Sequence, residues 1–333
     1  MKWETTEAIN LGFDFGLFNN RISGSLDLWT SNTYDLLYFK SAPPTSTFPS
    51  IIDNIGETKA QGLELAVNTA VVRTPRLNYN ISWSYSTFSD EVVAISDGLD
   101  RNQFGRQAHI VGEPVSIFYD YKAAGNWDVG EFADYLADWQ ARNPDLTHGF
   151  ISSYGQPGSI KIIDQNDDGQ INDDDKVVYN RAPKHIFGMN NSVTWGNFDL
   201  SVLVFARLGG YMEYGLNNQL NFESANWADL DYWTLDNRNA KFPNPGSASA
   251  NHSNFGTALL YEKADYVKIK DITLGYNLPA NLIGRVNLNR VRVYGSLKNY
   301  FTFSSIDNYD AERGGSVNFP LAKQMVFGLN VQF

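Results

Sequence analysis

The chain closes with Lys323-Gln324-Met325-Val326-Phe327-Gly328-Leu329-Asn330-Val331-Gln332-Phe333, in which apolar and polar residues alternate. Every second residue from Met325 to Phe333 is apolar, and the residues between them are polar or small, apart from Val326. Successive side chains of a strand point to opposite faces, so this stretch predicts a strand with one apolar and one polar face. A soluble sheet can carry such a strand, but the terminal aromatic residue favours an outer-membrane β-barrel, with an apolar lipid face and a polar lumen.

The same alternation recurs upstream. It predicts strands at 9–17, 22–28, 63–68, 77–85, 185–195, 198–208, 265–278 and 291–298, which with the last one makes about nine. Within 265–278, Lys268 and Lys270 share a face with apolar residues, and we expect a β-bulge that shifts the register. If the apolar face meets lipid, Glu64 faces the lumen, because a charge in the lipid costs on the order of a few kcal/mol.

The connections between these strands alternate in length. Short ones are expected near 18–21, 73–76, 196–197 and 279–289, and long ones at 31–56, 89–183, 209–262 and 304–321. Because consecutive strands are antiparallel, all the long segments fall at one end. The sequence therefore predicts an all-β fold, a transmembrane antiparallel β-barrel with short periplasmic turns and long extracellular loops.

Composition narrows the function. Aromatic residues make up 14% of the 333 residues and charged residues 19%, and no apolar run of about 18 residues could form a helical span. A glycan-binding β-sandwich with aromatic platforms is the alternative interpretation. The net charge of -11 argues against nucleic-acid binding. With no Cys and four scattered His, neither thiol chemistry nor a histidine metal site is expected.

The two ends of the chain suggest a larger protein. The first residues lack the basic and apolar regions of a secretory signal, which an outer-membrane protein needs. Nine is an odd number of strands, whereas bacterial single-chain barrels are closed and even-numbered. We therefore expect residues 1–333 to be the C-terminal part of a longer barrel protein, whose first strand here lacks its neighbour.

One motif carries chemistry. Residues 164–175, DQNDDGQINDDD, fit the calcium loop D-x-[DN]-x-[DN]-G with a carboxylate at position 12. The expected ligands are the side chains of Asp164, Asn166, Asp168 and Asp175 and the carbonyl of Gln170. Position 12 is Asp rather than Glu, and the preceding Ser159–Ile163 predicts a strand rather than a helix. A structural Ca²⁺ in an extracellular loop is the prediction, and an acidic solvated turn is the alternative. No catalytic constellation is present, so no enzyme is expected.

Several phrases together resemble the C-terminal barrel half of SusC/RagA-type TonB-dependent outer-membrane transporters. In family order they are Trp3-Glu4-Thr5, Asn10-Leu11-Gly12-Phe13-Asp14, Thr33-Tyr34-Asp35-Leu36-Leu37, Gly112-Glu113-Pro114, Phe118-Tyr119-Asp120-Tyr121, the 164–169 loop, Asp231-Tyr232-Trp233-Thr234, Tyr266 to Tyr276, Asn299-Tyr300-Phe301-Thr302 and Gly328 to Phe333.

The resemblance implies a 22-stranded barrel, filled by an N-terminal plug and covered by a SusD-like surface lipoprotein, in the outer membrane of a Gram-negative bacterium. It also implies import of oligosaccharides or oligopeptides, energised through TonB. The plug, the TonB-contacting N-terminal part and the first strands are absent from this sequence. The second hypothesis is a soluble, secreted, calcium-dependent β-sandwich that binds carbohydrate.

Under the transporter hypothesis, the segments 89–183 and 209–262 build the substrate mouth and the lipoprotein interface. Aromatic rings there are candidates to stack on sugars, and packing inside the loops is the alternative role for each. These candidate substrate contacts are Tyr119, Tyr121, Trp127, Trp227 and Trp233.

Overall fold

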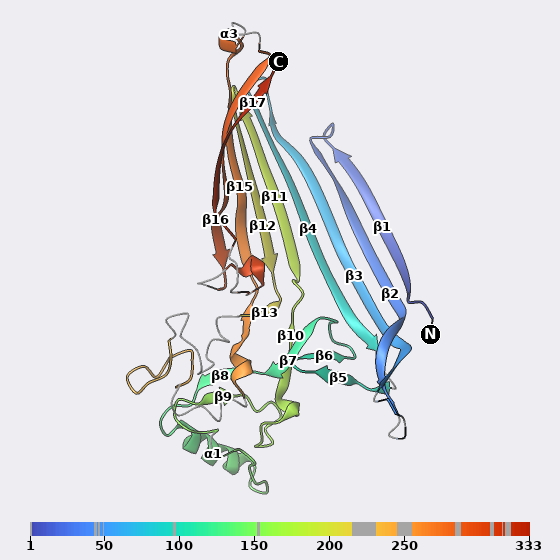
Figure 1. Ribbon diagram of the computed structural model, residues 1–333, viewed down its shortest axis with the longest axis vertical. Helices are drawn as coiled ribbons and strands as arrows, with labels where there is room; N and C mark the ends of the chain where they lie inside the picture. The colour runs from blue at the N-terminus through green and yellow to red at the C-terminus, as the bar shows by residue number, and fades with distance from the viewer. Residues whose placement is uncertain are drawn as a thin grey trace.

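The computed structural model describes residues 2–333 apart from 43–44, 46, 49, 96–97, 152–153, 215–230, 245–254, 284–287, 307–309, 315 and 317–320. In this described part, nine antiparallel strands form one tall sheet, in the order β1-β2-β3-β4-β11-β12-β15-β16-β17 (Figure 1). They are β1 (Thr5–Leu17), β2 (Ile22–Ser41), β3 (Ser50–Arg73), β4 (Leu77–Ala94), β11 (His185–Trp195), β12 (Phe198–Leu208), β15 (Tyr266–Asn277), β16 (Arg290–Ser304) and β17 (Gln324–Gln332). The predicted number of strands is confirmed.

The pairing register gives the sheet two unlike faces. One row across neighbouring strands holds Phe13, Leu26, Leu65, Tyr85 and Phe187, and the next row holds Gly12, Asp27, Glu64, Ser86 and Ile186. We call the first the apolar face and the second the polar face. Glu64 thus lies on the polar face, as predicted.

The apolar face is uncovered in the described residues. Phe13 is 64% exposed, Phe327 79% and Leu329 61%. A soluble sandwich would bury such residues against a second sheet, since that burial is what stabilises it. The sandwich alternative is therefore wrong, and the exposed face fits a strand wall that meets lipid.

The strands extend further than the alternation predicts. The expected loop at 31–56 is wrong, because β2 continues to Ser41 and β3 begins at Ser50. The outward row there contains Glu7, Asn32, Lys59 and Glu91, so both faces are polar and the period-2 signal disappears although the ladder of hydrogen bonds continues. The connection itself is the Pro-containing stretch 42–49.

The predicted sorting of connections is confirmed in the described chain. The turns after β1, β3, β11 and β15 lie at one end of the sheet, and the longer connections lie at the other (Figure 1). The hairpin at 185–195 and 198–208 matches its predicted bounds. The predicted bulge in β15 is also present, between Ile269 and Asp271.

The longer connections carry their own elements. A four-stranded sheet contains β10 (Lys176–Asn180), β7 (Ile117–Tyr121), β6 (Gln107–Ile110) and β5 (Arg101–Phe104), and two-stranded pairs are formed by β8 (Ala123–Asn126) with β9 (Ile160–Ile162) and β13 (Tyr211–Glu213) with β14 (Tyr261–Lys263). The helices are α1 (Glu131–Arg142) and α3 (Ala280–Ile283), with single 3₁₀ turns η2 (Asp173–Asp175), η4 (Gly256–Leu259) and η6 (Ala311–Arg313). None of the helices among the described residues is long and apolar enough to cross a membrane.

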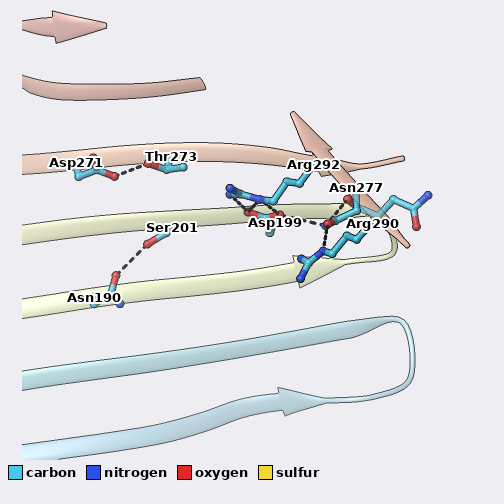
Figure 2. A network of polar contacts seen from close by, with 9 residues as sticks. Asn190, Asp199, Ser201, Asp271, Thr273, Asn277, Arg290 and Arg292 are labelled. Carbon is cyan, nitrogen blue, oxygen red and sulfur yellow. Dashed lines mark hydrogen bonds and ion pairs between the residues drawn. The ribbon is translucent and has the colours of Figure 1, made fainter. Parts of the chain in front are cut away.

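An ion pair ties three strands together on the polar face near the short-turn end (Figure 2). Arg292 on β16 donates to Asp199 on β12 through Nε at 2.9 Å and through Nη2 at 2.5 Å, and so crosses the intervening β15. A Cβ on Gly275 of β15 would lie 2.5 Å from both side chains. Asn277 holds the neighbouring Arg290 through a 2.8 Å hydrogen bond to its Nε. Glycine at 275 is what permits the ion pair.

We predict that Gly275→Ala destabilises the sheet by about 1–2 kcal/mol, the usual cost of breaking a partly buried polar contact. Gly295→Ala is the matched control, because its Cβ would meet the Phe327 ring at 3.4 Å, an ordinary contact. The measurement is thermal unfolding in detergent micelles. Gly275→Ala should add little to Arg292→Leu, and full additivity of the two would contradict the role of the ion pair.

A second prediction concerns a hydrogen bond on the apolar face, where the Tyr79 hydroxyl donates to Asn191 Oδ1 at 2.9 Å. Lipid offers no replacement partner, so Tyr79→Phe should cost about 1 kcal/mol. Adding Asn191→Leu should recover most of that loss, because no polar group is then left unpaired. Equal stability of Tyr79→Phe and the parent protein would show that the bond contributes nothing.

Candidate functional site

The elements at the long-connection end form what we call the loop domain, residues 95–183, 209–214, 231–244 and 255–264. Its core is aromatic. Trp127 is 1% exposed and packs against Phe132, Tyr135 and Tyr154, with ring centroids 5.1, 5.4 and 5.6 Å away. The Lys161 ammonium lies 4.5 Å from the same ring. Burial of these large rings, at roughly 25 cal/mol per Å², holds the domain together.

Two separate connections build this domain. The Tyr261 hydroxyl on β14 donates to the buried carboxylate of Asp120 on β7 at 2.7 Å. Arg106 pairs with Glu213 of β13 across the same junction. Burial, followed by the nearby Asp120, raises the pKa of Tyr261 far above its usual range, so this hydroxyl remains a donor. The connections 95–183 and 209–264 are thereby fastened to each other.

The acidic loop 164–175 wraps its carboxylates around its own backbone. Asp164 accepts from the amides of Asp168 (3.3 Å) and Gly169 (2.9 Å). Asp175 is fully buried and accepts from the amides of Gln165 (2.7 Å) and Asn172 (2.8 Å). Asp168 accepts from the amide of Gln170 at 2.8 Å and from the side chain of Asn166 at 3.1 Å. Gly169 has a φ of 77°, the left-handed turn predicted for this position.

The charges of the loop are unevenly neutralised. Two outward aspartates have basic partners, Asp167 with Arg142 and Asp173 with Lys176. The ion pairs of the described residues include none for Asp164, Asp168 or Asp175. Burial raises the pKa of Asp164, and the charges of Asp175 and Asp168 raise it further. The loop thus gathers negative charge that the protein itself leaves unbalanced.

The fit to a metal is partial. Among the described residues, no three acidic, His or Cys side chains meet closely enough to count as a preformed metal site. The carboxylates are instead oriented by backbone amides, and each carboxylate oxygen retains a second lone pair. β9 ends just before the loop, as predicted.

Helix α1 is docked on this loop, which the sequence analysis did not anticipate. Trp139 is completely buried, and its Nε1 donates to the Asp167 carbonyl at 3.1 Å. A side chain at Gly169 would overlap the Trp139 ring. The signal was present in the sequence, since Phe132, Tyr135, Leu136 and Trp139 follow helical spacing.

The aromatic candidates are packed rather than displayed. Trp127 and Trp233 are 1% and 3% exposed, so neither ring offers a face to a sugar in this conformation. Tyr119 is 8% exposed, and its hydroxyl accepts from Arg101 at 2.5 Å and donates to the Asp173 carbonyl at 3.1 Å. Tyr121 is half-buried between Phe255 and Lys176. Trp227 lies outside the described residues. The structure favours the packing role for the other four.

Comparison with known proteins places these features in a family. The family model for the "TonB dependent receptor-like, beta-barrel" matches residues 1–300. The chain is 28% identical to "TonB-dependent receptor P3" of Formosa agariphila over 360 residues, covering 100% of this chain and 34% of that protein. It is 27% identical to "TonB-dependent receptor SusC" of Bacteroides thetaiotaomicron, covering 100% of this chain and 32% of that protein. These names agree with the expectation that the chain is not an enzyme.

Solved structures show the same fold. The structure titled "Structure of the RagAB peptide transporter" superposes with a TM-score of 0.76 at 22% identity, covering 100% of this chain and 36% of that one. The RagAB "open-open" state gives the same TM-score of 0.76. The chain spans about a third of the length of these relatives. The SusC/RagA resemblance is confirmed, and with its two-faced antiparallel sheet and the match over residues 1–300, the chain belongs to the TonB-dependent receptor-like β-barrel family.

Proposed function

We propose that the chain is the C-terminal part of an outer-membrane importer of oligosaccharides or oligopeptides, energised through TonB. The observation that carries the proposal is the two-faced sheet with its loop domain at one end. An apolar face for lipid, a polar face for a lumen and long connections at one rim are the parts that such a wall requires. A relative named SusC and a structure titled as a peptide transporter support both substrate classes.

The remainder of the machinery comes from elsewhere in the protein. In this proposal β1 and β17, the two edges of the sheet, pair with further strands, because an open edge in lipid leaves backbone groups without partners. A plug segment occupies the polar face and contacts TonB. The wall is set in the outer membrane of a Gram-negative bacterium, with the loop domain outside.

A SusD-like surface lipoprotein is the proposed partner of the loop domain. Four apolar side chains there remain exposed although the core beneath them is dense: Val129 (52%), Leu146 (48%), Tyr232 (43%) and Leu235 (65%). The ion pair between Asp128 and Arg238, at 3.5 Å, joins the segments that carry Val129 and Leu235. Apolar residues rimmed by charges are typical of protein interfaces. They support a protein partner at this end better than a bare, solvated loop.

In the acidic loop we propose a structural Ca²⁺. Asp164, Asn166, Asp168 and Asp175 would supply side-chain oxygens and Gln170 its carbonyl, with the carboxylates turning from backbone amides toward the ion. The ion would balance charges that at ~4 Å and an effective dielectric of ~20 repel by about 4 kcal/mol per pair. Its part is to stiffen the loop on which α1 is docked.

The import proposal is tested in the host bacterium with the complete gene. Deleting the gene should reduce uptake of labelled oligosaccharides or oligopeptides to background, and inactivating TonB should give the same loss. Uptake of a free monosaccharide or amino acid, small enough for general pores, is the control. The lipoprotein should co-purify with the complete protein in detergent. Unchanged uptake of both cargo classes after deletion would overturn the proposal.

The calcium proposal is tested by calorimetry on the purified protein. We expect Ca²⁺ binding with a Kd of about 0.1–1 mM, the range of extracellular modules, and a rise in stability of about 2.7 kcal/mol at 100 times Kd. Asp164→Asn with Asp168→Asn should abolish both effects. Asp174→Asn, an exposed residue of the same loop, removes one of its charges and should preserve both. No heat of binding at 10 times the upper expected Kd would contradict the site.

A further inference from the structure

The connection between β16 and β17 folds back onto the polar face of the sheet. Its 3₁₀ turn η6 (Ala311–Arg313) is held there by two carboxylates that meet two lysines of β15. Asp310 Oδ2 lies 2.7 Å and Glu312 Oε2 3.0 Å from the Lys268 ammonium. Glu312 also pairs with Lys270 through its other oxygen. Two positive and two negative groups therefore balance within one cluster.

The lysines are placed by the bulge in β15. Lys268 lies opposite Phe205 of β12 and Thr302 of β16, on the polar face, and its side chain is only 1% exposed. Lys270 occupies the bulge itself, with its ammonium 5.2 Å from the Phe205 ring. The strand carboxylate nearest in sequence, Asp271, is engaged by the hydroxyls of Thr273 (2.6 Å) and Ser296 (2.8 Å). The connection, not the sheet, supplies the negative partners in the described ion pairs.

Apolar packing contributes little to this attachment. In the described residues of the connection, the buried apolar side chains are Ile306 and Ala311, at 5% and 3% exposure. The pairing charges lower the pKa of Glu312 against the opposing effect of burial, so its carboxylate remains ionised in this position. Removing one partner of a buried ion cluster leaves an uncompensated charge, which is strongly unfavourable. The ionic cluster is therefore the main restraint.

We propose that the β16–β17 connection is a strap latched to the polar face by the cluster Lys268, Lys270, Asp310 and Glu312. Because the restraint is electrostatic, the strap can leave as a unit when the charges are no longer matched. Its release uncovers two ammonium groups beside the Phe205 ring, a surface suited to anionic groups. Where apolar residues would fix the strap permanently, opposite charges make its attachment conditional.

The test follows the mobility of the strap directly. The chain contains no cysteine, so Arg313→Cys, at an exposed position of η6, gives a single site for a nitroxide spin label. The label is read by electron paramagnetic resonance on the full protein in lipid vesicles. We expect an immobile label in the parent and a mainly mobile label in Lys268→Gln with Lys270→Gln. Lys263→Gln, an exposed lysine of β14 with the same change of charge, should leave the label immobile.

Further variants separate the latch from general packing. If Lys268→Gln with Lys270→Gln does not fold, Asp310→Asn on the same labelled background removes one carboxylate and should mobilise the label partially. Ile306→Ala should have a smaller effect than either. An immobile label in the folded lysine variant, or a label that Ile306→Ala mobilises more than the charge changes do, would overturn the proposal.

Discussion

The structure depends on one constraint, the hydrogen-bonded register of the nine-stranded sheet. Backbone groups of a wall in lipid have no water to bond, so each strand must pair along its length with its neighbours. A period of two then assigns every side chain to a face, and a shift of one residue would exchange the faces. The rows across β1, β2, β3 and β4 keep Phe13, Leu26 and Leu65 together and leave Asp27 and Glu64 on the other side.

Sequence reasoning succeeded where the two faces meet different solvents. The hairpin at 185–195 and 198–208 was predicted to the residue, because apolar and polar side chains alternate along both strands. It failed at 31–56, where β2 and β3 rise beyond the apolar row and water wets both faces. Alternation reports a contrast between environments rather than the strand itself, so a strand with two polar faces gives no such signal.

The loop domain shows a different limit. Aromatic residues at 119, 121, 127 and 233 indicated either stacking platforms or a core, and composition does not separate the two. The choice depends on which segments cover each ring, and those contacts join residues far apart, such as Trp233 with Gly158. The acidic loop was located by its spacing, yet the docking of Trp139 on Gly169 came from α1, a helix whose periodicity was present but not recognised.

Charge is used in three ways along the same wall. Arg292 and Asp199 belong to neighbouring regions of the sheet and bind strand to strand. The acidic loop concentrates like charges and leaves room for a cation. Lys268 differs from both, because its partners belong to a connection that the sheet does not otherwise need. An ion pair between strands cannot separate without unfolding the ladder, whereas one between strand and connection can. The polar face is therefore rigid near the short turns, and conditional motion is restricted to the end that carries the loop domain.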